Sequence, residues 1–137
     1  MRKRRGFFFI ELLVHLALIA VLIGIIIPYY KNMKRRIGLR ICHRELSILK
    51  TALESYYESQ APKHYPPTTE NLCAEYLINA KPQVVTSVLI DPFSRPRREY
   101  HYALSPNEKF YCVWTVGLNR KSQIQGIDDE GNVIKDP

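Results

Sequence analysis

The first feature of the chain is a long apolar run close to its start. Residues 6–30 read GFFFIELLVHLALIAVLIGIIIPYY, and only Glu11 and His15 interrupt the apolar pattern. A helix over residues 7–27 rises ~1.5 Å per residue and is therefore roughly 30 Å long, the thickness of the hydrocarbon core of a bilayer. The run predicts one membrane-spanning helix over residues 7–30.

After this run, apolar residues recur at every third or fourth position. They are Leu39, Cys42, Leu46, Leu49, Leu53 and Tyr56. This spacing places them on one face of an amphipathic helix over residues 31–60, and the C-terminal part of the chain must cover that face. Pro28 and Gly38 weaken the long helix, which favours a bend or local unwinding at either position. The prolines that follow end the helix near Gln60.

Residues 61–137 are predicted to form a small globular head. A short helix is expected from Glu70 to about Asn79, with Thr69 as its N-cap. Residues 83–90 are ambiguous, because their β-branched content suggests a strand while the short segment also suits a loop or a helical turn. The next segment, 91–98, contains two prolines and predicts a loop.

Two alternating runs farther along predict a β-hairpin, with strands near 100–104 and 110–116 joined by a turn at 105–108. The face made by alternate residues from Phe110 to Val116 is expected to cover the apolar stripe of the helix. A long loop follows, and residues 132–134 are expected to add a third strand. The predicted fold class is α+β, with a long N-terminal helix packed on a small C-terminal antiparallel β-sheet.

Composition narrows the range of partners. A length of 137 residues leaves room for one small domain besides the membrane helix. The formal charge is +7, but residues 2–5 are all basic, so the rest of the chain carries only +3. This charge is weak support for a nucleic-acid partner, and we expect none. Six more basic residues lie within residues 31–44, so the basic residues at the two ends of the membrane helix leave its orientation open.

Two ordinary explanations of the N-terminus leave Glu11 unexplained. A secretory signal peptide has an apolar region of only ~7–15 residues and a small-residue cleavage site, and neither fits here. A plain single-pass anchor fits the length, but a carboxylate at the centre of a spanning helix costs ~2.5–3.5 kcal/mol. Ionisable groups in such helices normally have a partner or a function, so Glu11 is the first candidate functional residue.

The N-terminus also resembles a known family. Gly6, the segment FFFIELL at residues 7–13 and an apolar run that ends at Pro28 are similar to the start of type IV prepilins and of type II secretion pseudopilins. The resemblance implies that a prepilin peptidase cuts between Gly6 and Phe7 and methylates the new N-terminus. Residues 1–6 are then a cleaved basic leader.

The same resemblance implies a role for the acidic residue of the span. Glu11 would offset the free amine of a neighbouring subunit during filament assembly, and Pro28 belongs to the same assembly helix. A buried cation and anion cost less as a pair than singly. Residues 49–77 and 91–102 are similar to the helix end and to the Tyr-Pro-Thr and Asp-Pro-aromatic loops of major pseudopilins. The implied protein is a structural subunit of a pseudopilus that acts in type II protein secretion.

Partners and location follow from this resemblance. The implied partners are copies of the chain in a helical filament, the prepilin peptidase, the inner-membrane platform of the secretion system, minor pseudopilins and membrane lipid. The implied location is the bacterial inner membrane, with the N-terminus cytoplasmic and the head periplasmic. Two alternatives stay open. One is a minor pilin or a DNA-uptake pilin that uses residues 31–44 on phosphates, and the other is an unprocessed single-pass anchor with a binding head.

His15 lies one helical turn after Glu11, on the same face. One hypothesis is a hydrogen bond between the two side chains, which would lower the cost of burying both. The other is a neutral imidazole at a helix–helix contact. Either way, His15 is a candidate assembly residue.

The three cysteines are Cys42, Cys73 and Cys112, and their spacing does not suit a zinc site. An oxidising compartment allows one disulfide bond. Cys73–Cys112 is the pair we favour, because Cys42 lies on the helix stripe nearer the membrane. The alternative is three reduced, buried thiols that pack as small apolar residues.

The last loop carries adjacent carboxylates at Asp128 and Asp129. By resemblance to the major pseudopilins, these two residues are candidate calcium ligands, since calcium prefers oxygen ligands. Arg120 and Lys121 stand where the family loop is acidic and glycine-rich, and the alternative is a solvated acidic turn. We recognise no nucleophile–base spacing, phosphate-binding loop or metalloprotease motif, so no enzymatic activity is expected.

Overall fold

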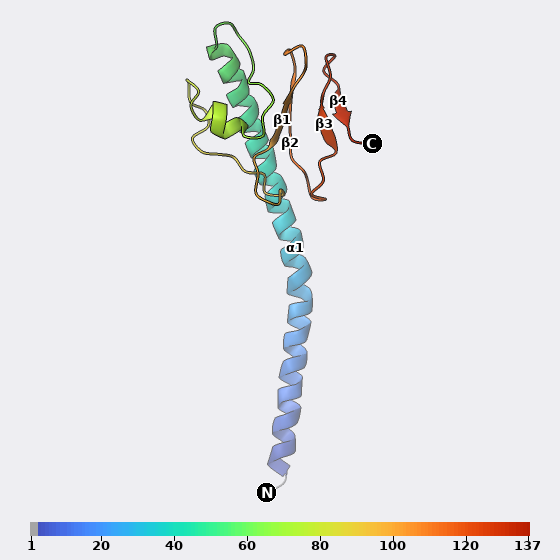
Figure 1. Ribbon diagram of the computed structural model, residues 1–137. Coiled ribbons are helices and arrows are strands. Elements are labelled where there is room, and N and C mark those ends of the chain that lie inside the picture. Colours follow the sequence, from blue (N-terminus) through green and yellow to red (C-terminus); the bar gives the residue numbers. More distant parts are fainter. Residues whose placement is uncertain (1–2) are drawn as a thin grey trace. The chain divides into compact units, whose positions relative to one another are not determined.

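The computed structural model describes residues 3–137, with side chains from Phe7 onward (Figure 1). Its elements are the helix α1 (Lys3–Ser59), the helical turn η1 (Cys73–Leu77) and the strands β1 (His101–Leu104), β2 (Tyr111–Trp114), β3 (Ile124–Ile127) and β4 (Val133–Lys135). The predicted α+β class is confirmed, because a long apolar N-terminal helix packs against small antiparallel sheets. The chain divides into two compact units at Ile37/Gly38.

The first unit is helical throughout its described part. Every described side chain from Phe7 to Arg36 is exposed, although most of those up to Ile27 are large and apolar. α1 continues through Pro28, whose ring nitrogen cannot donate to the carbonyl of Gly24 one turn earlier. By length and composition, this part of α1 is a candidate membrane span, and it is the only one among the described residues.

The second unit holds the hydrophobic core. Its fully buried members are Cys42, Leu49, Leu53, Leu72, Cys73, Leu77, Val85, Tyr100 and Tyr102, together with Ala52. The apolar stripe of α1 is therefore confirmed from Cys42 to Tyr56, with Leu46 and Tyr56 partly buried against the core, while Leu39 stays exposed. α1 ends at Ser59, one residue before the predicted end.

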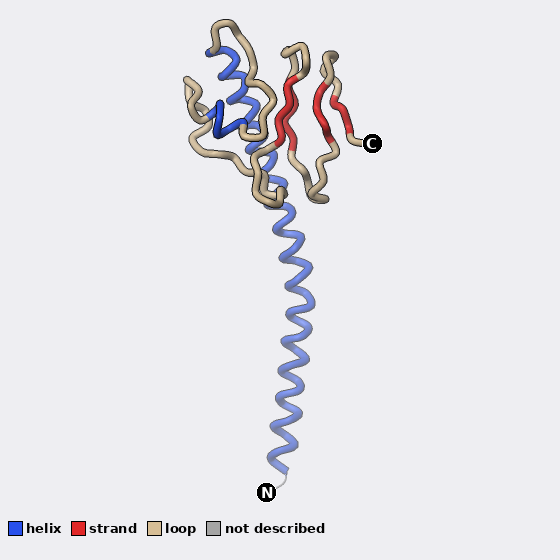
Figure 2. The backbone as a smooth tube through the Cα atoms, in the orientation of Figure 1, coloured by secondary structure: helices blue, strands red, loops and turns tan. Residues whose placement is uncertain are grey.

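The predicted hairpin is confirmed. β1 and β2 lie side by side (Figure 2) and pair antiparallel, and the register places His101 opposite Trp114 and Leu104 opposite Tyr111. The amide of Glu108 donates to the carbonyl of Ser105, which closes the predicted turn at 2.9 Å. The segment 91–98 is the predicted loop, and Ile90 and Glu99 form an isolated bridge at its base.

The prediction of which hairpin face covers the helix was wrong. Tyr111 and Val113 pack against the core that includes α1, whereas Trp114 stacks on its cross-strand partner His101 at 5.4 Å between ring centres. Strand residues alternate between faces, so Cys112 shares the face of Trp114 and points away from the helix.

A second hairpin covers this other face. β3 pairs antiparallel with β4, and both β1 and β2 contact β3. A Cβ added at Gly126 of β3 would lie 3.8 Å from the Cβ of Ala103, which sits opposite Cys112. The strand expected at residues 132–134 is β4, but it does not add a third strand to the first hairpin. It pairs with β3, which was predicted as loop, in a separate two-stranded sheet. Ile124 and Ile127 are separated by Gln-Gly, which breaks the alternating pattern.

The short helix predicted from Glu70 to Asn79 is only a five-residue turn, η1, preceded by Leu72. Thr69 is not its N-cap, although the Thr69 hydroxyl accepts from the amide of Asn71 at 3.2 Å. The first amides of η1 are satisfied from another element, as described below. A carboxylate from a residue distant in sequence thus takes the place of the predicted local cap.

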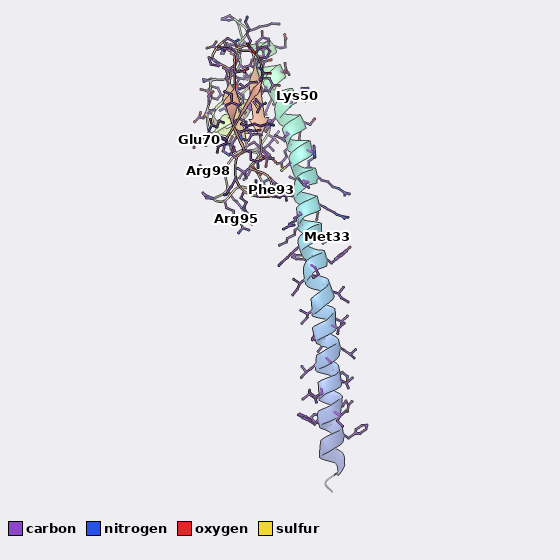
Figure 3. All side chains as sticks on the ribbon, turned by 90° about the vertical axis from the view of Figure 1, so that its right-hand side faces the viewer. Met33, Lys50, Glu70, Phe93, Arg95 and Arg98 are labelled. Carbon is purple, nitrogen blue, oxygen red and sulfur yellow. The ribbon has the colours of Figure 1, made fainter. Side chains whose placement is uncertain are left out.

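Gly38 is a packing position of the second unit rather than a bend. Phe93, from the loop after Asp91, places its ring against the helix backbone there (Figure 3). A Cβ added at Gly38 would lie 2.7 Å from Cζ of Phe93. The glycine therefore lets the loop approach α1 closely.

We predict that Gly38→Ala destabilises the protein when residue 93 is phenylalanine and stabilises it when residue 93 is alanine. In the natural chain, the added methyl overlaps the Phe93 ring at a typical cost of ~1–3 kcal/mol, against a gain of ~1 kcal/mol in helix propensity. The expected net change is a loss of about 1 kcal/mol in the free energy of unfolding.

The test is a double-mutant cycle on the full chain in detergent, followed by the fluorescence of the single tryptophan. In the Phe93→Ala background, Gly38→Ala should stabilise the protein by about 1 kcal/mol. Equal effects in both backgrounds would show that Phe93 does not constrain residue 38.

Candidate functional site

The candidate assembly site lies in the first unit. Phe7 is 75% exposed, and Glu11 projects from α1 one turn later. Among side chains 7–137, none forms an ion pair or a hydrogen bond with the Glu11 carboxylate. Gly6 lies within α1, and the structure describes its backbone alone. Residues 1–2 of the predicted leader lie outside the described residues.

The predicted side-chain hydrogen bond between His15 and Glu11 is not present in the form expected. Nδ1 of His15 donates to the backbone carbonyl of Glu11 at 2.7 Å. Because a carbonyl only accepts, this contact places the proton of a neutral imidazole on Nδ1. The imidazole therefore leaves the Glu11 carboxylate open to a different partner.

The surface around these residues is uniform. Large apolar residues from Phe8 to Ile27 are 47–69% exposed, and they surround α1 on all sides rather than along one stripe. A helix that is apolar all round is stable only in lipid or against other apolar helices. Such a surface is suited to contact with lipid tails or with similar helices.

Buried carboxylates organise the second unit, and sequence reasoning missed their role. Asp91 is 1% exposed. Its Oδ2 accepts from the Thr115 hydroxyl at 2.7 Å and from the amide of Val116 at 2.9 Å, and its Oδ1 accepts from the amide of Phe93 at 2.9 Å. Asp91 thereby ties the 91–98 loop to the end of β2. The Asp-Pro-Phe sequence signalled a loop but not this tie.

Glu99 plays a similar part for η1. Its carboxylate accepts from the amides of Cys73 at 2.6 Å and Ala74 at 3.2 Å. These are the unpaired donors at the start of the turn. Glu45 of α1 accepts from the hydroxyl of Tyr100 at 2.6 Å, and burial raises the pKa of that hydroxyl well above its usual range. These buried polar groups connect loop, turn and helix, and they have structural roles.

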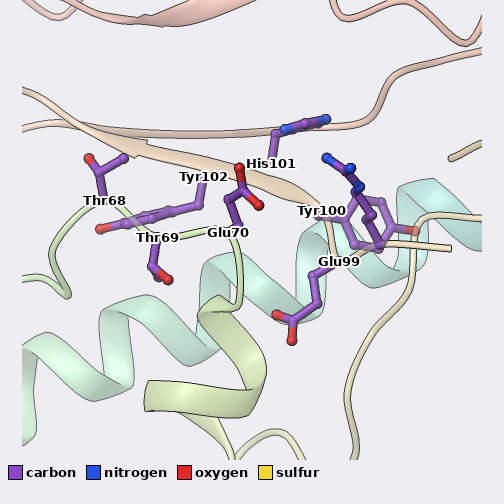
Figure 4. A pocket seen from close by; sticks show the side chains of 8 residues that line it. Thr68, Thr69, Glu70, Glu99, Tyr100, His101 and Tyr102 are labelled. Atoms are coloured by element: carbon purple, nitrogen blue, oxygen red, sulfur yellow. The ribbon is translucent and has the colours of Figure 1, made fainter. Parts of the chain in front are cut away.

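A cavity of about 280 Å³ lies beside β1 (Figure 4). Its lining consists of Thr68, Thr69, Glu70, Arg98, Glu99, Tyr100, His101 and Tyr102. Figure 4 shows Glu99 extending toward η1, where it is used as a cap. A hydroxyl activated by His101 would be hydrogen-bonded to the imidazole, and none in the described part of the chain is. We therefore propose no reaction for this cavity.

The predicted Cys73–Cys112 disulfide is absent, and all three thiols are free. The reason is the hairpin orientation. Cys73 is buried in the core on the helix side of β2, whereas Cys112 points to the opposite face. Burial raises the pKa of the Cys73 thiol to about 11, which lowers its reactivity.

We therefore predict three free thiols in the protein. The measurement is a thiol count on protein unfolded without reductant. Cys42 and Cys73 are expected to react only after unfolding, because both are buried. A count of one would mean that two of the three cysteines form a disulfide bond, which would contradict this prediction.

The candidate calcium ligands are already engaged. Oδ1 of Asp128 accepts from the amides of Asn132 at 2.7 Å and Glu130 at 3.0 Å, and these hydrogen bonds lower the pKa of this carboxyl. Oδ1 of Asp129 accepts from the amide of Asn107 at 2.7 Å. Over the part of the chain that the structure describes, no group of three or more His, Cys, Asp or Glu could hold a metal. Calcium binding by Asp128 and Asp129 stays an untested prediction.

Comparisons of the whole chain with models of protein families, with curated proteins and with solved structures gave no match.

Proposed function

We propose that this chain is a structural subunit of an inner-membrane-anchored pseudopilus that acts in type II protein secretion. It assembles through its apolar N-terminal helix after a prepilin peptidase removes residues 1–6. The sequence from Gly6 to Pro28, which resembles prepilins and pseudopilins, motivates the proposal.

One structural observation carries the proposal furthest. The first unit is an apolar helix whose single carboxylate, at Glu11, lacks a partner among side chains 7–137. A carboxylate in lipid without a partner is unstable, and a second chain can supply a partner that one chain lacks. The unsatisfied acid therefore favours association over a solitary anchor.

The proposed partner is the α-amine of Phe7 in a neighbouring copy. Cleavage after Gly6 creates this cation at the start of the apolar helix, one turn from Glu11 in sequence. A neighbour shifted along the helix axis can bring its amine to this carboxylate. The contact joins different surfaces of the two copies, so it repeats without closing and produces a filament.

The test of this function is the mass of the mature chain isolated from membranes of cells that contain the peptidase. The expected mass lacks residues 1–6 and includes one added methyl group on Phe7. A chain that still begins at Met1 would contradict the proposal and would favour an unprocessed single-pass anchor.

A further inference from the structure

The second unit carries opposite charges at its two ends. Phe93 contacts Gly38, and a groove there is lined by Leu39, Trp114 and Lys121, so these residues mark the end where the helix enters the unit. The exposed basic residues of this end are Arg40, Arg95, Arg97, Arg120, Lys121 and Lys135. Asp136 is an exposed carboxylate near them, and it accepts from the side chain of Gln125.

The far end lies where α1 stops and the β1–β2 turn begins. Its exposed carboxylates are Glu54, Glu58, Glu108, Asp129 and Glu130. Asn107 of the turn binds Asp129, which places the acidic loop at this end. Lys63 and Lys109 also lie here, and Lys63 is paired with Glu58. The unit is therefore basic where α1 enters and acidic on balance at the other end.

The basic end is presented on a firmly held loop. The Ser94 hydroxyl accepts from the amide of Arg98 at 2.8 Å, and the Asp91 carbonyl accepts from the amide of Ser94 at 3.2 Å. Arg95 and Arg97 form no ion pair with any carboxylate among the described side chains. Figure 3 shows Arg95 at the tip of this loop. The loop therefore holds two unpaired guanidinium groups outward, and its backbone loses little further conformational entropy when they bind a ligand.

The chain itself limits how far this end can lie from the membrane helix. Only eight Cα–Cα steps lead from Tyr30, where the apolar run ends, to Gly38. Even fully extended, they span at most about 28 Å. The linking segment, 31–37, carries four more basic residues. Any membrane surface entered by the apolar run is therefore within reach of the basic end.

We propose that this basic end docks on the anionic lipid headgroups of the membrane that the chain spans. Guanidinium groups bind lipid phosphates through paired hydrogen bonds. Each basic side chain close to an anionic surface favours contact by about five-fold at moderate salt. The inference rests on the apolar span and not on filament assembly. It gives the unassembled subunit a fixed orientation of its head.

The experiment uses energy transfer from Trp114, the only tryptophan, to a dansyl-labelled lipid. The full chain is reconstituted in vesicles of phosphatidylglycerol and phosphatidylcholine, or of phosphatidylcholine alone. Trp114 is 9% exposed and lines the groove at the basic end, so it reports proximity without being a contact residue. Transfer should be greater in the anionic vesicles, and high salt should remove the difference.

Matched variants identify the surface. Arg95→Glu/Arg97→Glu should lower the docked-to-undocked ratio in anionic vesicles by at least about 20-fold, from the five-fold contribution of each arginine. Lys63→Glu/Lys109→Glu changes the net charge equally at the far end and should leave transfer unchanged. The tryptophan emission maximum of each variant checks that the head stays folded.

Two results would overturn the proposal. One is equal transfer in anionic and neutral vesicles. The other is transfer that follows the protein-to-lipid ratio instead of lipid charge, which would mean that the basic end binds the acidic end of a second copy. The vesicles contain no peptidase and no secretion apparatus, so failure here leaves the proposed function untouched, and failure of processing leaves this result untouched.

Discussion

Glu11→Leu is expected to leave removal of the leader intact and to abolish incorporation of the chain into filaments. The substitution makes the membrane helix more apolar, so membrane insertion is favoured. It also leaves the α-amine of Phe7 in the neighbouring copy without its proposed counterion. Removing one partner of a buried ion pair typically costs ~3–5 kcal/mol, which lowers the association constant by roughly 10²- to 4 × 10³-fold per contact.

The measurement separates processing from assembly. Membranes are assayed for the mature chain by mass, and sheared filaments are assayed for the same chain by sedimentation. Glu11→Leu should appear only in the first fraction. His15→Leu is the matched control one turn away, because the imidazole binds a backbone carbonyl and not the carboxylate. His15→Leu should therefore assemble.

Two outcomes would count against this account of the helix. Normal assembly of Glu11→Leu would remove the carboxylate from the mechanism. Loss of assembly in both Glu11→Leu and His15→Leu would show that this turn of the helix acts through its packing surface, with no special role for the charge.

Asp91→Ala is expected to produce the largest loss of stability in the head. The carboxylate accepts from two backbone amides and one hydroxyl, and it is almost fully buried. Its removal leaves these donors unsatisfied, at ~1–3 kcal/mol for each that finds no water. A loss of about 3–5 kcal/mol in the free energy of unfolding is expected, which is a large part of the stability of a small domain.

The change is measured by urea unfolding of the full chain in detergent, followed by Trp114 fluorescence. Asp136→Ala is the control, because its exposed carboxylate accepts only from the Gln125 side chain, and it should shift stability by less than about 0.5 kcal/mol. Asp91→Asn keeps one acceptor oxygen and should lie between them. A loss below 1 kcal/mol for Asp91→Ala would show that the 91–98 loop does not hold the head together.

The elements that could be predicted from the sequence are those whose residue pattern is compatible with only one local structure. The apolar run, the stripe from Cys42 to Tyr56 and the β1–β2 hairpin with its proline-containing turn are of this kind. Each depends on local spacing or local turn chemistry, which a sequence carries directly.

The orientation of β2 could not be read in this way. Both faces of the strand are apolar, since Tyr111 and Val113 alternate with Cys112 and Trp114. Both faces are also covered, one by α1 and the other by the hairpin that contains β3. Alternation indicates a strand but does not say which face meets which neighbour.

The buried acids were missed for a related reason. Asp91 and Glu99 lie in polar, proline-rich sequence that indicates an exposed loop. Their burial depends on amides brought from residues 73, 74 and 116, which no local pattern reveals. Glu11 could be singled out because a lone carboxylate in an apolar helix is costly wherever the rest of the chain folds.

The central claim is that the acid of the membrane helix is satisfied by the amine of a different copy. Solid-state NMR of filaments assembled from a mixture of chains tests this claim most directly. Half of the copies carry ¹³C at the Glu11 carboxyl, and the other half carry ¹⁵N at the Phe7 amine. The account predicts a ¹³C–¹⁵N contact at ion-pair distance, within about 4 Å, which only different copies can produce in this mixture. A Glu11 carboxyl that is protonated and has no contact with the amine of another copy would contradict it.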